Sequence, residues 1–300
     1  MLDYTQMSLF AGGPWIGALA VPGQEQGRMT SYQDVVDRLE QSPAIKNLVI
    51  TGGEPLMHPD LLDILRAAKQ NGYDRIMLRT TGRRFVDLKF LEHIIDAGAH
   101  KFEIMPFTRP EGNDAFSSKL IRDNIRGLRA MRRMSTLISD SFQFLYIALV
   151  VPVCRDNYLY LPDIVQTILD SVHVDRVIFC WGDPGFSIWQ AEQAVGEAID
   201  RCIRRRIWAV TRGIPICAIP RKTHHLEEIF INPDEQQKLS LPELCRECCF
   251  DRICASMHGI SAVYTMTVKP FSSHPFAPQM NDVFDKGHVF DESNAPLYER

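Results

Sequence analysis

Apolar, strand-like runs alternate with amphipathic, helix-like segments along most of this chain of 300 residues. The clearest unit joins the apolar run 48–50 to a segment over 61–68, in which apolar residues recur at the i, i+3, i+4, i+7 spacing of one helical face. Strands that alternate with helices predict a parallel sheet covered by helices. The sequence therefore predicts an α/β fold.

Six such units are expected. The strands are predicted at residues 4–10, 48–50, 75–82, 101–106, 142–151 and 174–180, and the helices at about 30–39, 61–68, 86–97, 117–133, 161–169 and 188–211. The first helix is expected to begin at a capping box of Thr30 and Gln33. Six units are too few for a full eight-stranded barrel of about 250 residues, so a doubly wound sheet and a partial barrel both remain open.

Composition excludes several classes of protein. The net charge of −4 and the pI near 6.1 give no general attraction to nucleic acid or membranes. No apolar run approaches the ~20 residues that span a bilayer, and the N-terminus lacks the basic start of a signal peptide. We expect a cytoplasmic protein, whose eight cysteines are thiols or metal ligands rather than disulfides.

The stretch 47–60 is the most informative part of the chain. It reads as a buried strand, then Gly52 and Gly53, then Glu54 and Pro55, then the start of a helix. Paired glycines stand where a chain turns sharply or where a ligand approaches the backbone. In parallel α/β proteins, the loop after a strand's carboxyl end is where ligands bind.

Residues 51–60 read Thr-Gly-Gly-Glu-Pro-Leu-Met-His-Pro-Asp, and this string resembles the GGEP loop of radical SAM enzymes. In that family the loop holds the amino group of S-adenosylmethionine (SAM). The resemblance implies that Gly52, Gly53, Glu54 and Pro55 bind this cofactor. It also favours a partial (β/α)6 TIM-like barrel over residues 1–213. The alternative is an ordinary strand-to-helix loop whose glycines serve only steric needs.

One family motif is missing from this chain. Radical SAM enzymes normally carry C-x3-C-x2-C after the first strand, where three thiolates hold the 4Fe–4S cluster that chelates SAM. The matching loop, residues 11–25, contains no cysteine, and the first cysteine is Cys154. Iron in such clusters takes thiolates almost exclusively. The usual reductive cleavage of SAM therefore has no obvious catalyst, SAM binding is in doubt, and no catalytic residue is assigned.

A second group of cysteines lies near the C-terminus. Cys245, Cys248 and Cys254 form a C-x2-C-x5-C pattern, which in a cytosolic protein indicates a metal site. A cluster or a tetrahedral zinc needs a fourth ligand, for which Cys217 is our candidate. Cys249 and His258 are the alternatives.

The layout of these cysteines resembles the auxiliary-cluster extension of radical SAM proteins, of the SPASM or shortened "twitch" kind. The resemblance implies one auxiliary 4Fe–4S cluster in an extension over residues 214–300. The full SPASM pattern continues with a further C-x3-C step, but His258 stands there and no later cysteine exists. Zinc is the alternative metal, and thiols that merely pack in a core are the remaining interpretation.

We therefore expect a degenerate radical SAM-like protein that acts as a non-catalytic partner, or as a regulatory or substrate-presenting subunit. Its partner would be a catalytically complete radical SAM protein or a peptide substrate. Alternatively, the chain is an enzyme that binds SAM or a similar ligand at the GGEP loop without the usual cluster, or that uses the C-terminal cluster for electron transfer. A structural zinc scaffold is a third class.

The fourth predicted helix is strongly basic and includes Arg129, Arg132 and Arg133. Most runs of charge on helices are solvated faces. A surface for a partner or an acidic peptide is the alternative.

Overall fold

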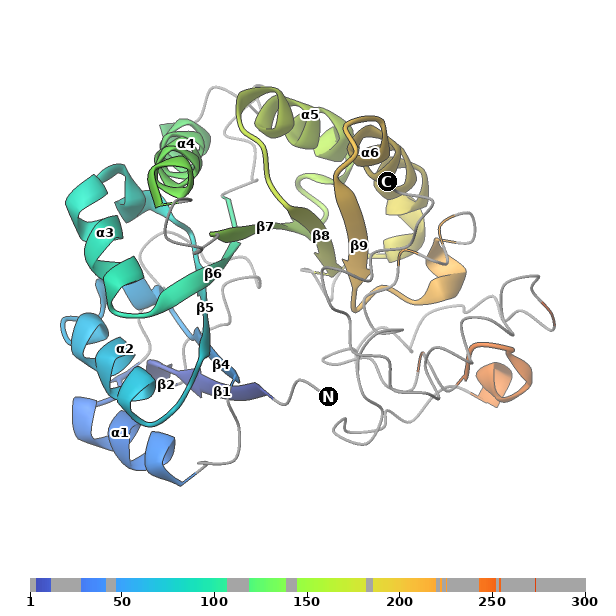
Figure 1. Ribbon diagram of the computed structural model, residues 1–300. Coiled ribbons are helices and arrows are strands. Elements are labelled where there is room, and N and C mark those ends of the chain that lie inside the picture. The colour runs from blue at the N-terminus through green and yellow to red at the C-terminus, as the bar shows by residue number, and fades with distance from the viewer. Residues whose placement is uncertain are drawn as a thin grey trace. The chain divides into compact units, whose positions relative to one another are not determined.

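The computed structural model describes residues 4–11, 28–41, 47–106, 119–138, 145–181, 186–219 and 243–251, and besides these only residues 222, 225, 254 and 273 (Figure 1). Nearly all of the loop 11–25 and the alternative metal ligand His258 lie outside the described residues. In the described part of the chain, no helix has both the length and the apolar character that a membrane crossing requires.

The chain groups into two compact units. The first unit comprises Leu2–Pro152 and Thr167–Asp175, and the second comprises Val153–Gln166 and Arg176–Arg300. The expected boundary at residue 213 stays a prediction, because most residues after 219 lie outside the described part.

The strands of the first unit form parallel pairs in the order β1-β4-β5-β6-β7. They are β1 (Tyr4–Ser8), β4 (Asn47–Thr51), β5 (Arg75–Thr80), β6 (Ala99–Ile104) and β7 (Tyr146–Val153). Between β1 and β4 in the sequence, β2 (Phe10–Ala11) and β3 (Arg28–Met29) form a separate, short antiparallel pair. Every residue of β4 is buried, as expected for a strand inside a parallel sheet.

The helices of this unit are α1 (Tyr32–Glu40), α2 (Leu61–Gln70), α3 (Leu88–Asp96) and α4 (Lys119–Ile138). They lie on one side of the strands β1, β4, β5 and β6 (Figure 1). A doubly wound sheet has helices on both faces, so the first unit does not follow that alternative. The predicted α/β class, with parallel strands alternating with helices, is confirmed.

Helix α1 begins one residue later than the predicted capping box requires. Ser31, not Thr30, is the N-cap: its backbone is extended and its hydroxyl accepts a hydrogen bond from the Asp34 amide at 3.2 Å. Because the cap lies one residue on, Gln33 falls at the second helical position, where its side chain donates to Asp37 instead. The capping-box prediction is therefore wrong in register, although the helix itself is confirmed.

The second unit contains β8 (Arg176–Trp181), β9 (Trp208–Arg212) and α6 (Glu192–Arg204), while α5 (Leu161–Ser171) has residues in both units. Strand β9 runs parallel to β8, with Arg176 opposite Trp208. Arg201 on α6 forms ion pairs with Asp163 at 2.8 Å and with Glu197 at 2.9 Å.

The prediction of one long helix over 188–211 is wrong, because its last part is β9. The chain leaves α6 through Arg206, whose φ of 58° is left-handed. The Arg206 amide donates to the Ile203 carbonyl at 2.8 Å and the Ile207 amide donates to the Cys202 carbonyl at 3.0 Å. This pattern ends a helix, and it normally uses glycine. An arginine at the left-handed position left no turn signal in the sequence.

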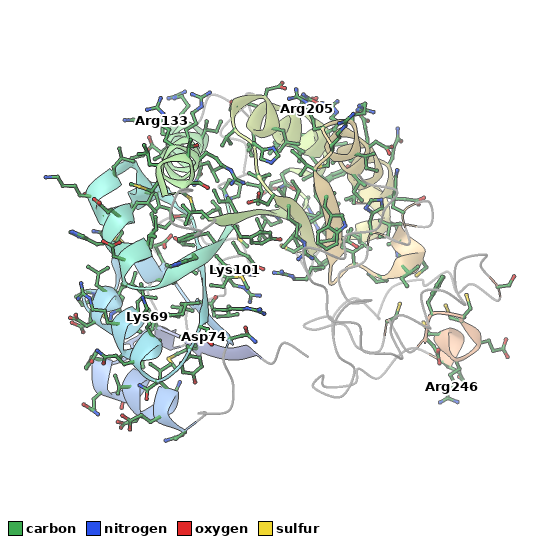
Figure 2. The ribbon with its side chains drawn as sticks, viewed as in Figure 1. Lys69, Asp74, Lys101, Arg133, Arg205 and Arg246 are labelled. Atoms are coloured by element: carbon green, nitrogen blue, oxygen red, sulfur yellow. The ribbon has the colours of Figure 1, made fainter. Side chains whose placement is uncertain are left out.

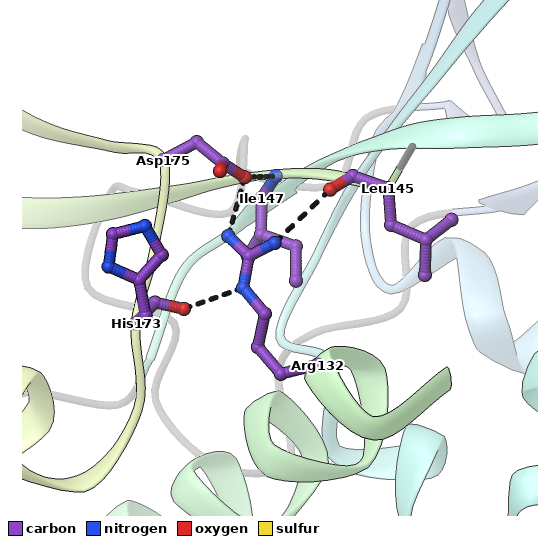
Figure 3. A network of polar contacts seen from close by, with 5 residues as sticks. All are labelled: Arg132, Leu145, Ile147, His173 and Asp175. Atoms are coloured by element: carbon purple, nitrogen blue, oxygen red, sulfur yellow. Dashed lines mark hydrogen bonds and ion pairs between the residues drawn. The ribbon is translucent and has the colours of Figure 1, made fainter. Parts of the chain in front are cut away.

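Arg132 joins three segments of the first unit (Figure 3). From α4 it donates to the carbonyl of His173 at 2.7 Å and to that of Leu145 at 3.3 Å, and it pairs with Asp175 at 2.6 Å. The same Asp175 oxygen accepts from the Ile147 amide at 2.7 Å. One arginine of the basic helix is therefore committed to holding α4 against the start of β7.

Candidate functional site

The loop after β4 has the sharp turn that the sequence predicts. Gly52 and Gly53 have φ values of 83° and 54°, both left-handed. Side chains rarely adopt this backbone conformation, so the two glycines have a conformational reason to be there. A single 3-10 turn over Pro55–Met57 follows and leads toward α2.

The carboxylate of Glu54 is bound by donors from its own turn and from the end of β5. One oxygen accepts from the Leu56 amide at 3.2 Å and from the hydroxyl of Thr80. The other accepts from the Thr81 amide at 2.9 Å and from the hydroxyl of the same residue. Glu54 thus closes the turn and ties it to the neighbouring strand end.

His58 fixes the far side of the loop. It is buried, its Nδ1 accepts from the Asp60 amide at 3.2 Å, and its Nε2 lies 2.9 Å from the Thr30 carbonyl. Since Nδ1 accepts a hydrogen bond, the proton of the neutral ring is on Nε2, which donates to Thr30. Sequence reasoning assigned no role to His58; its place in the motif was the only signal.

The end of β5 is held from α4 as well. Asn124 donates to the Thr81 carbonyl at 2.6 Å. A Cβ on Gly127 of α4 would stand 2.4 Å from the Gly82 carbonyl oxygen. The helix therefore approaches this turn closely enough to exclude any side chain at residue 127. Thr80, Thr81 and Gly82 act as a structural strand-end turn.

Thr51, the last residue of β4, has a side chain that is not hydrogen-bonded to the described residues around it. It is only 1% exposed, and its hydroxyl has no hydrogen-bond partner among the residues that the structure describes. A buried hydroxyl without a partner carries a desolvation cost. It is a polar atom beside the glycine turn that a ligand can satisfy.

The four cysteines predicted as metal ligands all lie in the second unit. Cys217 is in a 3-10 turn, Ile216–Ala218, and Cys245 in another, Glu243–Glu247. The segment after it folds back on itself: the Cys248 amide donates to the Cys245 carbonyl, and the Cys254 amide to the Phe250 carbonyl, both at 3.0 Å. Phe250 is fully buried and anchors the segment.

The thiols of this group interact with one another. Burial raises the pKa of Cys245 to about 11, with further contributions from the charges of Cys217 and Cys248. Burial raises the pKa of Cys254 well above its usual value, and the charges of Cys217, Cys248 and Cys245 add to the effect. Cys217 is therefore near enough to Cys245 and Cys254 for its charge to act on them, although it precedes them by at least 28 residues in the sequence.

Cys249 has different neighbours. Burial raises its pKa, and the charges that add to this come from Cys248 and Asp251. His258, the other alternative ligand, lies outside the described residues. Within the described residues, no three His, Cys, Asp or Glu side chains stand in an arrangement that could hold a metal ion. The thiols are gathered, but as placed they do not converge on one point.

Replacing Glu54 by Gln should destabilise the first unit by about 1–2 kcal/mol, since an amide NH2 would face donors that now meet a carboxylate oxygen. Urea unfolding followed by circular dichroism measures this. Glu92→Gln on the exposed face of α3 is the matched control and should change the free energy of unfolding by less than about 0.5 kcal/mol. Equal effects of the two substitutions would contradict a structural role for the Glu54 carboxylate.

Comparison with known proteins agrees with this description. The family model described as the radical SAM superfamily matches residues 18–137, which include the glycine turn, β5, β6 and most of α4. No curated protein matches the sequence. Among solved structures, SuiB from Streptococcus suis matches with a TM-score of 0.50 and 12% sequence identity. The match covers 77% of this chain and 55% of SuiB, so this chain spans about half of that protein, and at this identity the likeness concerns the fold alone. The family model thus likens residues 18–137, which are 40% of the chain, to the radical SAM superfamily, and the fold that contains this segment is similar to that of SuiB.

Proposed function

We propose that this chain is a degenerate radical SAM protein that lacks the SAM-activating cluster, keeps one auxiliary metal centre and serves a partner as a non-catalytic subunit. Its role would be to regulate a catalytically complete radical SAM protein or to present a peptide substrate to one. One observation carries this: the segment that matches the superfamily, residues 18–137, contains no cysteine.

Members of the superfamily typically bind a 4Fe–4S cluster and SAM. Such clusters are held by thiolates, and every residue before Cys154 lacks a thiol. The donor set at the amino-terminal end of the chain therefore does not fit the activating cluster. We derive no radical chemistry for this protein.

The glycine turn supports a reduced role for SAM. Gly52 and Gly53 keep a left-handed conformation, but the carboxylate of Glu54 is occupied by donors from Leu56, Thr80 and Thr81. A ligand here would depend on backbone groups and on the buried hydroxyl of Thr51. Without a unique iron to chelate its methionine part, SAM would lose its main anchor.

The C-terminal cysteines fit a metal by their chemistry. Four thiols are the donor set of a 4Fe–4S cluster or of a tetrahedral zinc, and Cys217, Cys245, Cys248 and Cys254 interact through their charges. To bind, the thiols must lose their protons and turn toward a common centre, because they do not converge as placed. An iron–sulfur centre would supply electron transfer or cross-linking of the C-terminal segment; zinc would supply cross-linking alone.

Several features remain part of the same proposal. They are a partial (β/α)6 barrel over residues 1–213, a SPASM- or twitch-like extension over 214–300, and a cytoplasmic location. The one-sided helix layer of the first unit supports the barrel (Figure 1).

An enzyme is the second candidate. In this case the GGEP loop binds SAM or another amino acid-like ligand for chemistry without the usual cluster, or the C-terminal centre transfers electrons. The intact glycine turn and the unpartnered hydroxyl of Thr51, taken among the described residues, favour it.

Titration of the anaerobically reconstituted chain with SAM separates the two candidates. We expect weak or no heat of binding by calorimetry, because the iron anchor is missing. Under reducing conditions, 5′-deoxyadenosine should not exceed a no-enzyme control. A micromolar dissociation constant, or product above the control, would overturn the non-catalytic proposal and support the enzyme.

Single alanine substitutions test the metal centre. Each of four single variants should contain less iron or zinc per chain than the native protein, since four thiolates complete the site. These variants replace Cys217, Cys245, Cys248 or Cys254 by alanine. Cys249→Ala is the adjacent control and Cys202→Ala a control for losing a buried thiol elsewhere; both should keep their metal. If Cys249→Ala or His258→Ala loses metal while Cys217→Ala keeps it, the ligand assignment is wrong. If no variant changes metal content, there is no auxiliary centre at these cysteines.

A further inference from the structure

Helix α4 carries a row of exposed arginines along one face. Arg122, Arg126, Arg129 and Arg133 are all exposed and follow one another at steps of four, three and four residues. At 3.6 residues per turn, these four positions fall within an arc of about 60° and extend over about 16 Å of helix. Figure 2 labels Arg133, which projects from α4 away from the strands. We call these four residues the arginine row.

The arginine row differs in exposure from Arg132, which is bound inside the first unit (Figure 3), although Arg122 also has an interaction of its own. Arg126 has a loose ion pair with Asp123 at 3.8 Å, and its side chain is 70% exposed. Arg129 donates through Nε to the Ser171 carbonyl at 3.1 Å, which leaves its outer guanidinium nitrogens beyond that bond. Arg133 forms no ion pair within the part of the chain that the structure describes.

The row does not stabilise the helix that carries it. Like charges at i, i+3 and i, i+4 weaken a helix by a few tenths of a kcal/mol per pair, and the buried face of α4 lies elsewhere, at residues such as Asn124, Leu128 and Met131. Helix α4 contains six basic residues and one acidic residue, whereas the whole chain has a net charge of −4. Positive charge is therefore concentrated on this helix against the sign of the chain.

We infer that the arginine row is a docking surface for an acidic α-helical segment of a partner protein. Guanidinium groups pair with carboxylates through two parallel hydrogen bonds. A helix with Glu or Asp at i, i+4, i+7 and i+11 presents carboxylates at the same repeat as the row. The negative charge of the whole chain opposes a long polyanion such as nucleic acid, whereas a short acidic helix meets only the local positive field.

If the chain serves a partner as a subunit, the arginine row would be the surface that binds an acidic helix of that partner, so the inference rests on the proposed function. The residues are separate from the glycine turn and from the cysteines. Metal content and SAM binding test the proposed function, and the arginine row has its own test.

The test uses the full chain and fluorescein-labelled helical peptides in anisotropy titrations at low ionic strength. One peptide has four Glu at the spacing of the row; a second has the same composition with the Glu spread around the helix; a single-stranded DNA of equal charge is the third probe. The variant Arg126→Gln/Arg133→Gln removes two charges from the row. Arg66→Gln/Lys69→Gln, on the exposed face of α2, is the control with the same loss of charge.

We expect the spaced peptide to bind the native chain and the α2 control equally. It should bind the row variant about tenfold more weakly, as the loss of two charge-assisted pairs implies. The spread peptide should bind several-fold more weakly than the spaced one. If the two peptides bound with equal affinity, or if the row variant and the α2 control lost equal affinity, binding would depend only on net charge and not on the row. Either result would overturn the inference. No binding of the spaced peptide would overturn it too, and tighter row-dependent binding of DNA would show that the partner class is wrong.

Discussion

The hydrogen bonds of the Glu54 carboxylate hold together the loops of the candidate site at the ends of β4 and β5. They join a glycine turn after β4 to the end of β5, two places 26 and 27 residues apart in sequence. Asn124 and the close approach of Gly127 then bring α4 against the same turn. The glycine turn is thus a structural joint between β4, β5 and α4.

The thiols are unevenly distributed between the two compact units of the chain. The first unit, which carries the glycine turn, has no cysteine; all eight belong to the second unit. Cys154, Cys180 and Cys202 are buried there, and the remaining five lie in or beside the two 3-10 turns. A thiolate-bound centre can therefore form only in the second unit. Burial raises the pKa of Cys245 and of Cys254, so the binding of a metal by their thiolates would release protons. The affinity for such a metal would therefore rise with pH, because more of the thiols would already be deprotonated.

Local patterns were enough to predict the α/β class, most strands and the glycine turn, because apolar periodicity and glycine act within a few residues. The assignment of Cys217 as the fourth ligand of the C-terminal cysteines stays a prediction, because the described thiols do not converge on one point. The partners of Glu54 could not be predicted, since they depend on which strand becomes the neighbour of β4. Strand β9 was hidden because Arg206 takes a turn conformation that glycine usually marks. The N-cap of α1 is Ser31 and not the predicted Thr30, and the sequence could not distinguish the two because both have a hydroxyl that can cap a helix.

We propose that only the C-terminal cysteines of this chain can hold iron. Anaerobic reconstitution of a Cys245→Ala/Cys248→Ala variant with iron and sulfide, beside the native chain, tests it most directly. Absorption and electron paramagnetic resonance of the reduced samples should show a cluster in the native chain and none in the variant. A stable 4Fe–4S signal from the variant would place a cluster elsewhere in the chain and contradict the account.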